Sequence, residues 1–166
     1  MIFVNKRVMV LLAVLGLAAC GAGCAHARTA TEPVPNPSLD LPQGNLTVAG
    51  SGGPKLSLHV QIAETAQSRE RGLMGVKKMP DQVGMAFLFG EPTSTGFWMK
   101  DTLIPLDIAF WDSKGRIVAT FAMTPCRTDS CPVYQPATTY VSSVEMNAGL
   151  LAARGIKAGD QVTLTR

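Results

Sequence analysis

The stretch that decides the fold is FWMKDTLIPLDIAF, residues 97–110, in which Lys100, Asp101 and Asp107 interrupt an otherwise strongly apolar sequence. A buried charge is costly unless it is paired or used in binding or chemistry. The stretch therefore predicts either a satisfied network of charges inside the fold or the floor of a functional site.

The second half of this stretch predicts a β-strand over residues 106–111. Side chains alternate between the two faces of a strand, so Asp107 shares a face with Ala109 and Trp111. The opposite face holds Leu106, Ile108 and Phe110. One carboxylate is thus expected among apolar neighbours on one face of a sheet.

Further strands follow on both sides of this one. The turn residues Asp-Ser-Lys-Gly at 112–115 join it to a second strand over 116–123, which predicts a hairpin. Alternating or continuous apolar runs predict other strands. These lie at residues 56–62, 84–89, 97–99, 140–146 and 161–165, with a short candidate at 46–48.

Two short helices complete the expected elements. One covers residues 66–73 with Thr65 as its N-cap, and the other covers 148–154 with Asn147 as its N-cap. Many short strands with two short helices predict an α+β fold. We expect a small, mostly β domain built on a strongly bent sheet or partial barrel.

The N-terminus has the features of an export signal. Lys6 and Arg7 precede an apolar run at 8–17, which is too short to span a bilayer. The tetrapeptide Leu-Ala-Ala-Cys that ends at Cys20 looks like a bacterial lipoprotein box. That resemblance implies a signal peptide over residues 1–19 and a lipid on the Cys20 sulfur.

A competing cleavage site is Ala-His-Ala at 25–27, which would release a secreted or periplasmic soluble protein from Arg28 onward. We favour the lipoprotein box because Cys20 follows the apolar run directly. The expected location is therefore extracytoplasmic, with the protein held on a membrane by its acyl chains.

Residues 20–55 predict a lipid-anchored flexible tether, because prolines lie among Thr, Ser, Asn and Gly and no apolar period persists. Its prolines are Pro33, Pro35, Pro37, Pro42 and Pro54. Residues 56–166 then form a single globular domain, with an alternative start near residue 46.

Export places the chain in an oxidising compartment, where Cys126 and Cys131 can pair. We predict a short disulfide that pins a loop, with metal binding or redox chemistry as the alternatives. The spacing is not Cys-x-x-Cys, and no second pair or nearby His completes a zinc site. No metal and no cofactor are therefore predicted.

The charge of the chain argues against a nucleic-acid partner. The formal net charge is +3, and it falls to about +1 when Lys6 and Arg7 leave with the signal peptide. No run of Lys and Arg with interleaved aromatics is present.

An ordered set of short motifs carries a family resemblance over residues 56–164. The motifs are Arg71-Gly72-Leu73-Met74, Gly84-Met85-Ala86-Phe87, Phe97-Trp98-Met99-Lys100 with Thr102, Pro105-Leu106-Asp107-Ile108, Glu145-Met146-Asn147-Ala148-Gly149 and Gly155-Ile156-Lys157-Ala158-Gly159-Asp160. In this set the chain resembles the domain of unknown function 192 family. The resemblance implies a small, mostly β fold that is often exported, and it implies no known activity. Asp101 stands where the family usually has Asn, and the pair of Cys126 and Cys131 is a feature of some members.

The charged residues of these motifs are the candidate site. As ligand-binding candidates, Lys100, Asp107, Arg71 and Glu145 would meet in a polar cleft, with Trp98 as a stacking surface. The competing interpretation, which the sequence favours, is that these charges pair with one another and determine the register of the sheet.

The function favoured by the sequence is a membrane-anchored binding module for a cell-envelope ligand, which would be a saccharide, a peptide or a protein. An enzyme is less favoured, because His26 and His59 are the only histidines and no Gly-x-Ser-x-Gly motif is present. One alternative is a small hydrolase or lyase that uses Asp107 and Glu145, with Lys100 stabilising the developing charge. Another is an envelope assembly factor that contacts a second protein.

Overall fold

The structure, a computed structural model, describes residues 35–36 and 39–166. The predicted signal peptide, the lipoprotein box with Cys20 and the competing site at 25–27 lie outside the described residues. Within the described part, no helix is long and apolar enough to cross a bilayer.

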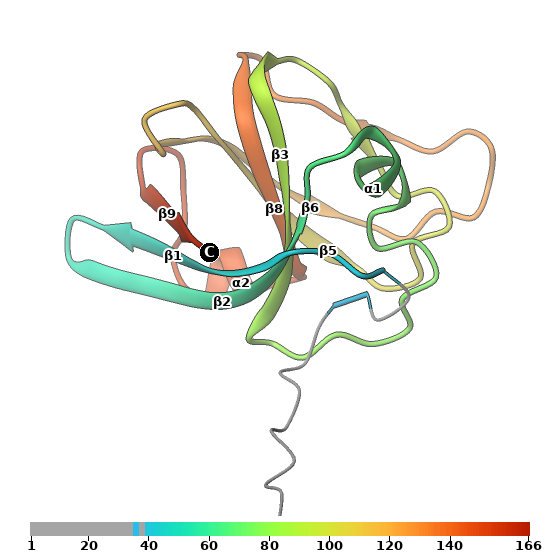
Figure 1. Cartoon of the computed structure of the whole chain (residues 1–166), viewed down its shortest axis with the longest axis horizontal. Helices are drawn as coiled ribbons and strands as arrows, with labels where there is room; N and C mark the ends of the chain where they lie inside the picture. Colours follow the sequence, from blue (N-terminus) through green and yellow to red (C-terminus); the bar gives the residue numbers. More distant parts are fainter. Residues whose placement is uncertain (1–34, 37–38) are drawn as a thin grey trace, which may run out of the picture. The chain divides into compact units, whose positions relative to one another are not determined.

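Short strands dominate the described chain (Figure 1). In chain order the elements are β1 (Gln43–Gly50), β2 (Gly53–Ala63), α1 (Ala66–Arg71), β3 (Val83–Thr93), β4 (Phe97–Trp98), β5 (Leu106–Trp111), β6 (Ile117–Met123), β7 (Val133–Tyr134), β8 (Tyr140–Asn147), α2 (Leu150–Ala153) and β9 (Gln161–Thr165). Seven strands form one mixed sheet in the order β6-β5-β8-β3-β2-β1-β9, and β4 pairs with β7 in a separate small sheet. Within the large sheet β2 and β3 are parallel, and the other neighbours are antiparallel.

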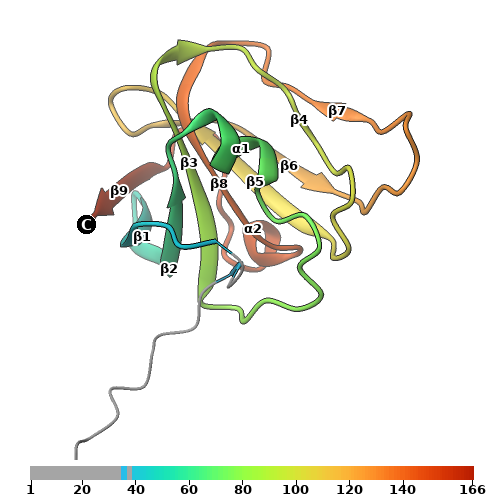
Figure 2. The same ribbon diagram turned by 45° about the vertical axis from the view of Figure 1, so that its right-hand side comes forward.

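The large sheet bends until its two edge strands approach each other at one end (Figure 2). There the Ile117 amide donates to the Asp160 carbonyl at 2.8 Å, and the Val162 amide donates to the Gly115 carbonyl at 2.7 Å. The sheet does not close fully, because these contacts join only the ends of β6 and β9. The predicted α+β class, with a bent sheet and two short helices, is confirmed.

The two faces of the sheet carry separate hydrophobic cores. One core joins Val48 of β1 and Val162 of β9 to Ala109 and Trp111 of β5, which lie far apart in strand order. Such contacts require the sheet to bend toward this face, so we call it the inner core. The core on the other face contains Leu106, Ile108, Phe110, Met85 and Phe87, among others, and we call it the outer core. The predicted division of the side chains of β5 between two faces is therefore confirmed.

The sheet begins earlier than the predicted tether allows. Strand β1 and the first part of β2 lie within residues 43–55, which the sequence assigns to the tether, and the alternative start near 46 is closer. Leu46 and Val48 are fully buried because β1 pairs with β2 on one side and β9 on the other. Strand β9, which pairs with β1, lies far away in the sequence. The local Gly, Pro and Asn residues therefore predicted a tether where pairing with a distant strand forms a buried strand.

Helix α1 begins as the sequence predicts. The Thr65 hydroxyl accepts from the Ser68 amide at 3.1 Å, and the Ser68 hydroxyl accepts from the Thr65 amide at 3.0 Å, which forms a capping box. The helix ends at Arg71, before Gly72 with φ +46° and earlier than the predicted residue 73.

Helix α2 begins two residues later than predicted, and the prediction of Asn147 as its N-cap is wrong. The Asn147 side chain instead donates to the Met79 carbonyl and the Asp81 carboxylate, both at 2.8 Å. Asp107, which is 2% exposed, accepts from the Leu151 amide at 2.9 Å. The Asp107 carboxylate on β5 thus supplies a hydrogen-bond acceptor for the backbone at the start of α2. Burial raises the pKa of the Asp107 carboxyl, although hydrogen bonds from the Leu151 and Gly149 amides act in the opposite direction.

We expect Asp107→Ala to lower the free energy of unfolding by about 1–3 kcal/mol, because it leaves buried amide groups without an acceptor. Urea unfolding of the purified protein measures the effect. Asp40→Ala, at an exposed aspartate, is the matched control and should change stability by less than about 0.5 kcal/mol. Equal stability of the two variants would contradict this structural role.

Candidate functional site

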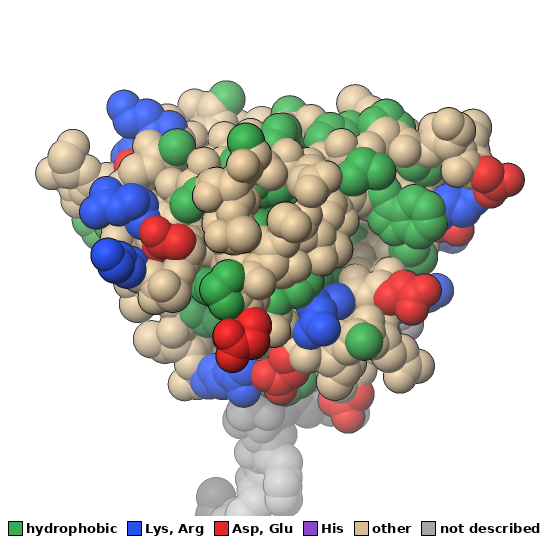
Figure 3. Space-filling view, turned by 90° about the horizontal axis from the view of Figure 1, so that it is seen from above, with side chains coloured by type: hydrophobic (Ala, Val, Ile, Leu, Met, Phe, Trp, Pro, Cys, Tyr) green, Lys and Arg blue, Asp and Glu red, His purple; other side chains and the backbone are tan. Residues whose placement is uncertain are grey.

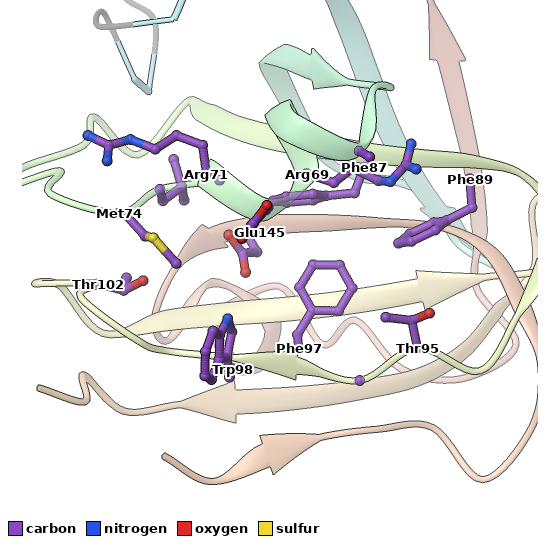
Figure 4. A pocket seen from close by; sticks show the side chains of 15 residues that line it. Arg69, Arg71, Met74, Phe87, Phe89, Thr95, Phe97, Trp98, Thr102 and Glu145 are labelled. Carbon is purple, nitrogen blue, oxygen red and sulfur yellow. The ribbon is translucent and has the colours of Figure 1, made fainter. Parts of the chain in front are cut away.

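A cavity of about 380 Å³ lies over the outer core, beside α1 and β4 (Figure 4). Its walls are mainly apolar and aromatic, with two arginines and two glutamates among them. The lining residues are Ala66, Arg69, Glu70, Arg71, Gly72, Leu73, Met74, Phe87, Phe89, Thr95, Gly96, Phe97, Trp98, Thr102 and Glu145. Concave sites of this composition are typical of small-ligand pockets.

Phe97 of β4 anchors the aromatic side of the cavity. Its ring meets those of Phe87 and Phe110 edge-to-face, with centroids 5.0 and 5.4 Å apart. In the sheet, Ser143 of β8 lies between Phe87 and Phe110. A small residue at this position leaves room for a ring that packs over both neighbours. The position of Phe97 is therefore determined by the sheet beneath it.

Glu145 supplies the buried carboxyl group of the cavity. It lies on β8 between Met85 of β3 and Ile108 of β5, and it is 5% exposed. Figure 4 shows its side chain pointing into the space bordered by Met74, Phe97 and Trp98. No residue in the described part of the chain forms a hydrogen bond or ion pair with this carboxyl group. Burial raises the pKa of Glu145 from 4.5 to about 8, so the group is largely neutral at pH 7.

Trp98 forms an exposed part of the cavity wall, at 48% exposure. It pairs across the small sheet with Val133, which is 63% exposed, so two large apolar side chains lie at the surface here.

The structure contains the predicted disulfide between Cys126 and Cys131, in the loop that leads from β6 to β7. The loop is thereby restrained near the strand that supports Trp98.

The two arginines of α1 extend away from Glu145 in opposite directions (Figure 4). The Arg69 guanidinium donates to the carbonyls of Glu64 at 2.7 Å and Leu88 at 2.9 Å, and lies 5.0 Å from the Phe89 ring centroid. Arg69 is thus a structural part of the wall. Arg71 is exposed and borders the mouth of the cavity.

Three of the predicted site residues therefore meet at one cavity, namely Arg71, Trp98 and Glu145. The other two lie elsewhere. Lys100 forms an ion pair with the exposed Asp129 at 2.6 Å, and this hydrogen bond raises the pKa of Lys100. Asp107 pairs with Met146 of β8, the residue after Glu145, so it faces the inner core while Glu145 faces the outer core. The sheet separates the two carboxyl groups that the hydrolase hypothesis needs on one substrate bond.

Asp101, which stands where the family usually has Asn, adopts a backbone conformation that both residue types favour. It adopts φ +54°, a left-handed conformation in which Asn and Asp are the favoured non-glycine residues. Its amide donates to the Cys126 carbonyl and its carbonyl accepts from the Gly75 amide, both at 3.0 Å. The side chain is exposed and is not part of the cavity lining.

Phe87, Phe97, Met74 and Thr102 belong to the cavity although the sequence did not single them out as site residues. A signal was present, because each lies in one of the motifs on which the family resemblance rests. Apolar side chains in strands are ordinarily core residues, so their residue type alone could not mark them as site residues.

Across the described chain, no group of His, Cys, Asp and Glu is arranged to hold a metal ion.

The surface offers no field of one charge sign on the face seen in Figure 3. Basic and acidic side chains are interspersed there, mostly toward the margins of the face. Apolar and neutral polar groups cover the rest. This pattern agrees with the low net charge of the chain.

We expect the burial of Glu145 to make stability depend on pH. The folded-state pKa of about 8 lies above the ordinary 4.5, so the folded chain binds the proton more tightly. The resulting stabilisation is complete below about pH 4.5 and is lost as pH rises to about 8, by at most about 1.4 kcal/mol per pH unit.

Urea unfolding of wild type and Glu145→Gln between about pH 5 and pH 8 measures this contribution as the difference between the two chains. Wild type should lose stability relative to the variant as pH rises. Glu91→Gln, at an exposed position of β3, should keep the wild-type slope. Parallel curves for wild type and Glu145→Gln would contradict the assignment.

Comparison with known proteins agrees with the motifs around this cavity. The model of the domain of unknown function 192 family, described as an uncharacterized ACR, matches residues 47–164. A solved structure of a protein of unknown function from Novosphingobium aromaticivorans is 32% identical, with a TM-score of 0.71 over 81% of this chain and 94% of that one.

A second solved structure, from Sinorhizobium meliloti and described provisionally as a transcription regulator, is 27% identical. Its TM-score is 0.70 over 76% of this chain and 96% of that one. No curated protein matches the chain. The matched segment includes the strands from β2 to β8, all but the last residue of β9 and the whole cavity, and the chain belongs to the domain of unknown function 192 family.

Proposed function

We propose that the protein is a membrane-anchored, extracytoplasmic binding module that takes a small ligand, or one terminal group of a larger ligand, into the cavity at Glu145. The observation that carries this proposal is a buried carboxyl group that faces an aromatic cavity without a partner among the described residues. Buried polar groups in folded proteins are ordinarily hydrogen-bonded, so a vacant acid in a cavity indicates a position for a ligand.

The size of the cavity limits what enters it. About 380 Å³ is at the lower end of the range for small-molecule pockets, which is roughly 300–1,000 Å³. This volume suits a single sugar ring, an amino-acid side chain or a chain terminus. A protein partner would therefore present one such group to the cavity, rather than bind through it as a whole.

Binding is favoured over catalysis by the placement of the carboxyl groups. Carboxylate-dependent hydrolysis of glycosides uses two carboxyl groups on either side of one bond. Here Asp107 is occupied by α2 on the inner face, and Glu145 is the one buried acid on the cavity side among the described residues.

We do not propose for this chain the regulator role attributed to the Sinorhizobium relative. A nucleic-acid-binding surface needs a concentrated basic face, and the one face seen in Figure 3 carries charges of mixed sign. The expected net charge of about +1 after export supports the same conclusion.

The lipoprotein box supports a location for ligand binding on the extracytoplasmic side of a membrane. Asn36 is buried and hydrogen-bonded to Gln61 and Gly72, so the free part of the proposed tether ends before it. A random coil from Cys20 to Pro35 would have a root-mean-square length of about 20–25 Å. A domain held at that distance can reach ligands in the envelope next to the membrane. The proposed ligand is therefore a component of the cell envelope.

Thermal denaturation with a panel of envelope saccharides and peptides tests the binding function. A ligand should raise the Tm of wild type and of Lys100→Ala, whose side chain lies outside the cavity. Trp98→Ala should lose most of this shift at the same ligand concentration. An equal shift in Trp98→Ala would place the ligand elsewhere and contradict the proposal.

The anchor has its own test. The exported protein should carry lipid on Cys20 by intact mass, and Cys20→Ser should be released without lipid. Cys24→Ser is the matched control and should remain lipidated. An unmodified mature chain that begins at Arg28 would show the competing cleavage instead.

A further inference from the structure

The charged groups that line the cavity are unequal in depth. Glu145 is buried, Glu70 and Arg71 are exposed at the mouth, and Arg69 is bound to two carbonyls and packed against Phe89. Of the four, Glu145 alone points into the interior without a partner in the described part of the chain. The buried end of the cavity is thus complementary to a positive group.

The remaining walls exclude most neutral polar ligands. Around Glu145 the lining consists of the side chains of Met74, Phe87, Phe97 and Trp98, with the hydroxyl of Thr102 nearby. A sugar ring that filled this space would place several hydroxyl groups against apolar surface, each with a penalty for lost hydration. An aliphatic stem with a single polar head fits these walls better.

The head group is expected to be cationic for two reasons. An anion would find no cation at the buried end of the cavity, because Arg69 is bound to two carbonyls and Arg71 lies exposed at the mouth. An ammonium group pairs with the buried carboxylate and is attracted to the faces of neighbouring aromatic rings, here Phe87, Phe97 and Trp98.

Building on the proposed function, we propose that the cavity binds an aliphatic ammonium group, carried on an alkyl stem, through an ion pair with Glu145. The source is a lysine-type side chain or another primary amine of the envelope, and an amino sugar offers the same head group on a more polar body. Binding replaces a proton by the ligand cation. The neutral acid and the ammonium ion become a carboxylate–ammonium pair, and one proton leaves to solvent.

This exchange makes affinity depend on pH in a defined direction. With a pKa of about 8 for Glu145 in the empty cavity, the acid is mostly protonated at pH 7, so binding releases most of one proton. Affinity should rise nearly tenfold from pH 6 to pH 7 and level off above about pH 8, until the amine itself begins to deprotonate. Arg69, Glu70 and Arg71 are the other charged groups of the lining.

Isothermal titration calorimetry of the purified protein tests the inference, with Nα-acetyl-lysine methylamide as the probe. Titrations at pH 7 in phosphate and in MOPS measure proton release, because the two buffers differ in ionisation enthalpy and neither carries a primary ammonium group. Wild type and Glu91→Gln should bind the probe with release of most of one proton. Glu145→Gln, which keeps the shape of the neutral acid, should bind at least tenfold more weakly and release none.

Matched probes identify the source of the ammonium group. The Nε-acetylated form of the same lysine probe removes the charge and should not bind. Glucosamine and N-acetylglucosamine form the corresponding pair for the amino-sugar source. Tighter binding of glucosamine than of the lysine probe would contradict the proposal that the ligand has an alkyl stem. Binding of either acetylated probe with no proton release would contradict the proposal that its head group is a cation.

The two proposals fail in different ways. A neutral ligand that binds wild type but not Trp98→Ala overturns the ammonium inference and leaves the binding function intact. Absence of binding by every probe in both this experiment and the thermal panel overturns both. Should Glu145→Gln fail to fold, the dependence of the wild-type heat on buffer decides the matter by itself.

Discussion

The alternation of side chains in the paired strands β5 and β8 is the constraint on which the rest of this structure depends. Asp107 pairs with Met146 and Ile108 pairs with Glu145, so one step along each strand exchanges the faces. The buried acids of these two strands, Asp107 and Glu145, therefore face different cores. A shift of one residue in this register would exchange every apolar side chain of β5 between the inner and outer cores, which makes the register strongly specified.

The two acids illustrate how surroundings determine the role of a residue type. Asp107 accepts hydrogen bonds at the start of α2 and is thereby satisfied within the fold. Glu145 has no such partner among the described residues and faces a cavity instead. Burial raises the pKa of both carboxyl groups, but Glu145 alone has room beside it for another molecule. The acid on the inner face is thus satisfied within the fold, and the acid on the outer face borders the cavity for which we propose a ligand.

The outer face also shows how a short strand can shape a site. Strand β4 is only two residues long, yet Phe97 packs on the outer core and Trp98 remains half exposed. Its partner β7 follows the disulfide loop, whose Cys126 forms bridges to Lys100 and Thr102. The segment that carries the cavity wall is therefore held by backbone contacts to β7 and to Cys126, whose loop is closed by the disulfide, and this preorganises the aromatic surface.

The sequence by itself determined the fold class, the hairpin of β5 and β6, the strand at the C-terminus and the capped start of α1, because each depends on local period, turn residues or a cap. It also singled out Arg71, Trp98 and Glu145, and it predicted the disulfide. Only the tertiary structure decided that Lys100 and Asp107 lie outside the cavity and that β1 pairs within the sheet. It alone also showed that the Asp107 carboxylate accepts a hydrogen bond from the start of α2. Each of these depends on partners distant in the chain, and no local pattern records which face or which distant strand a side chain will meet.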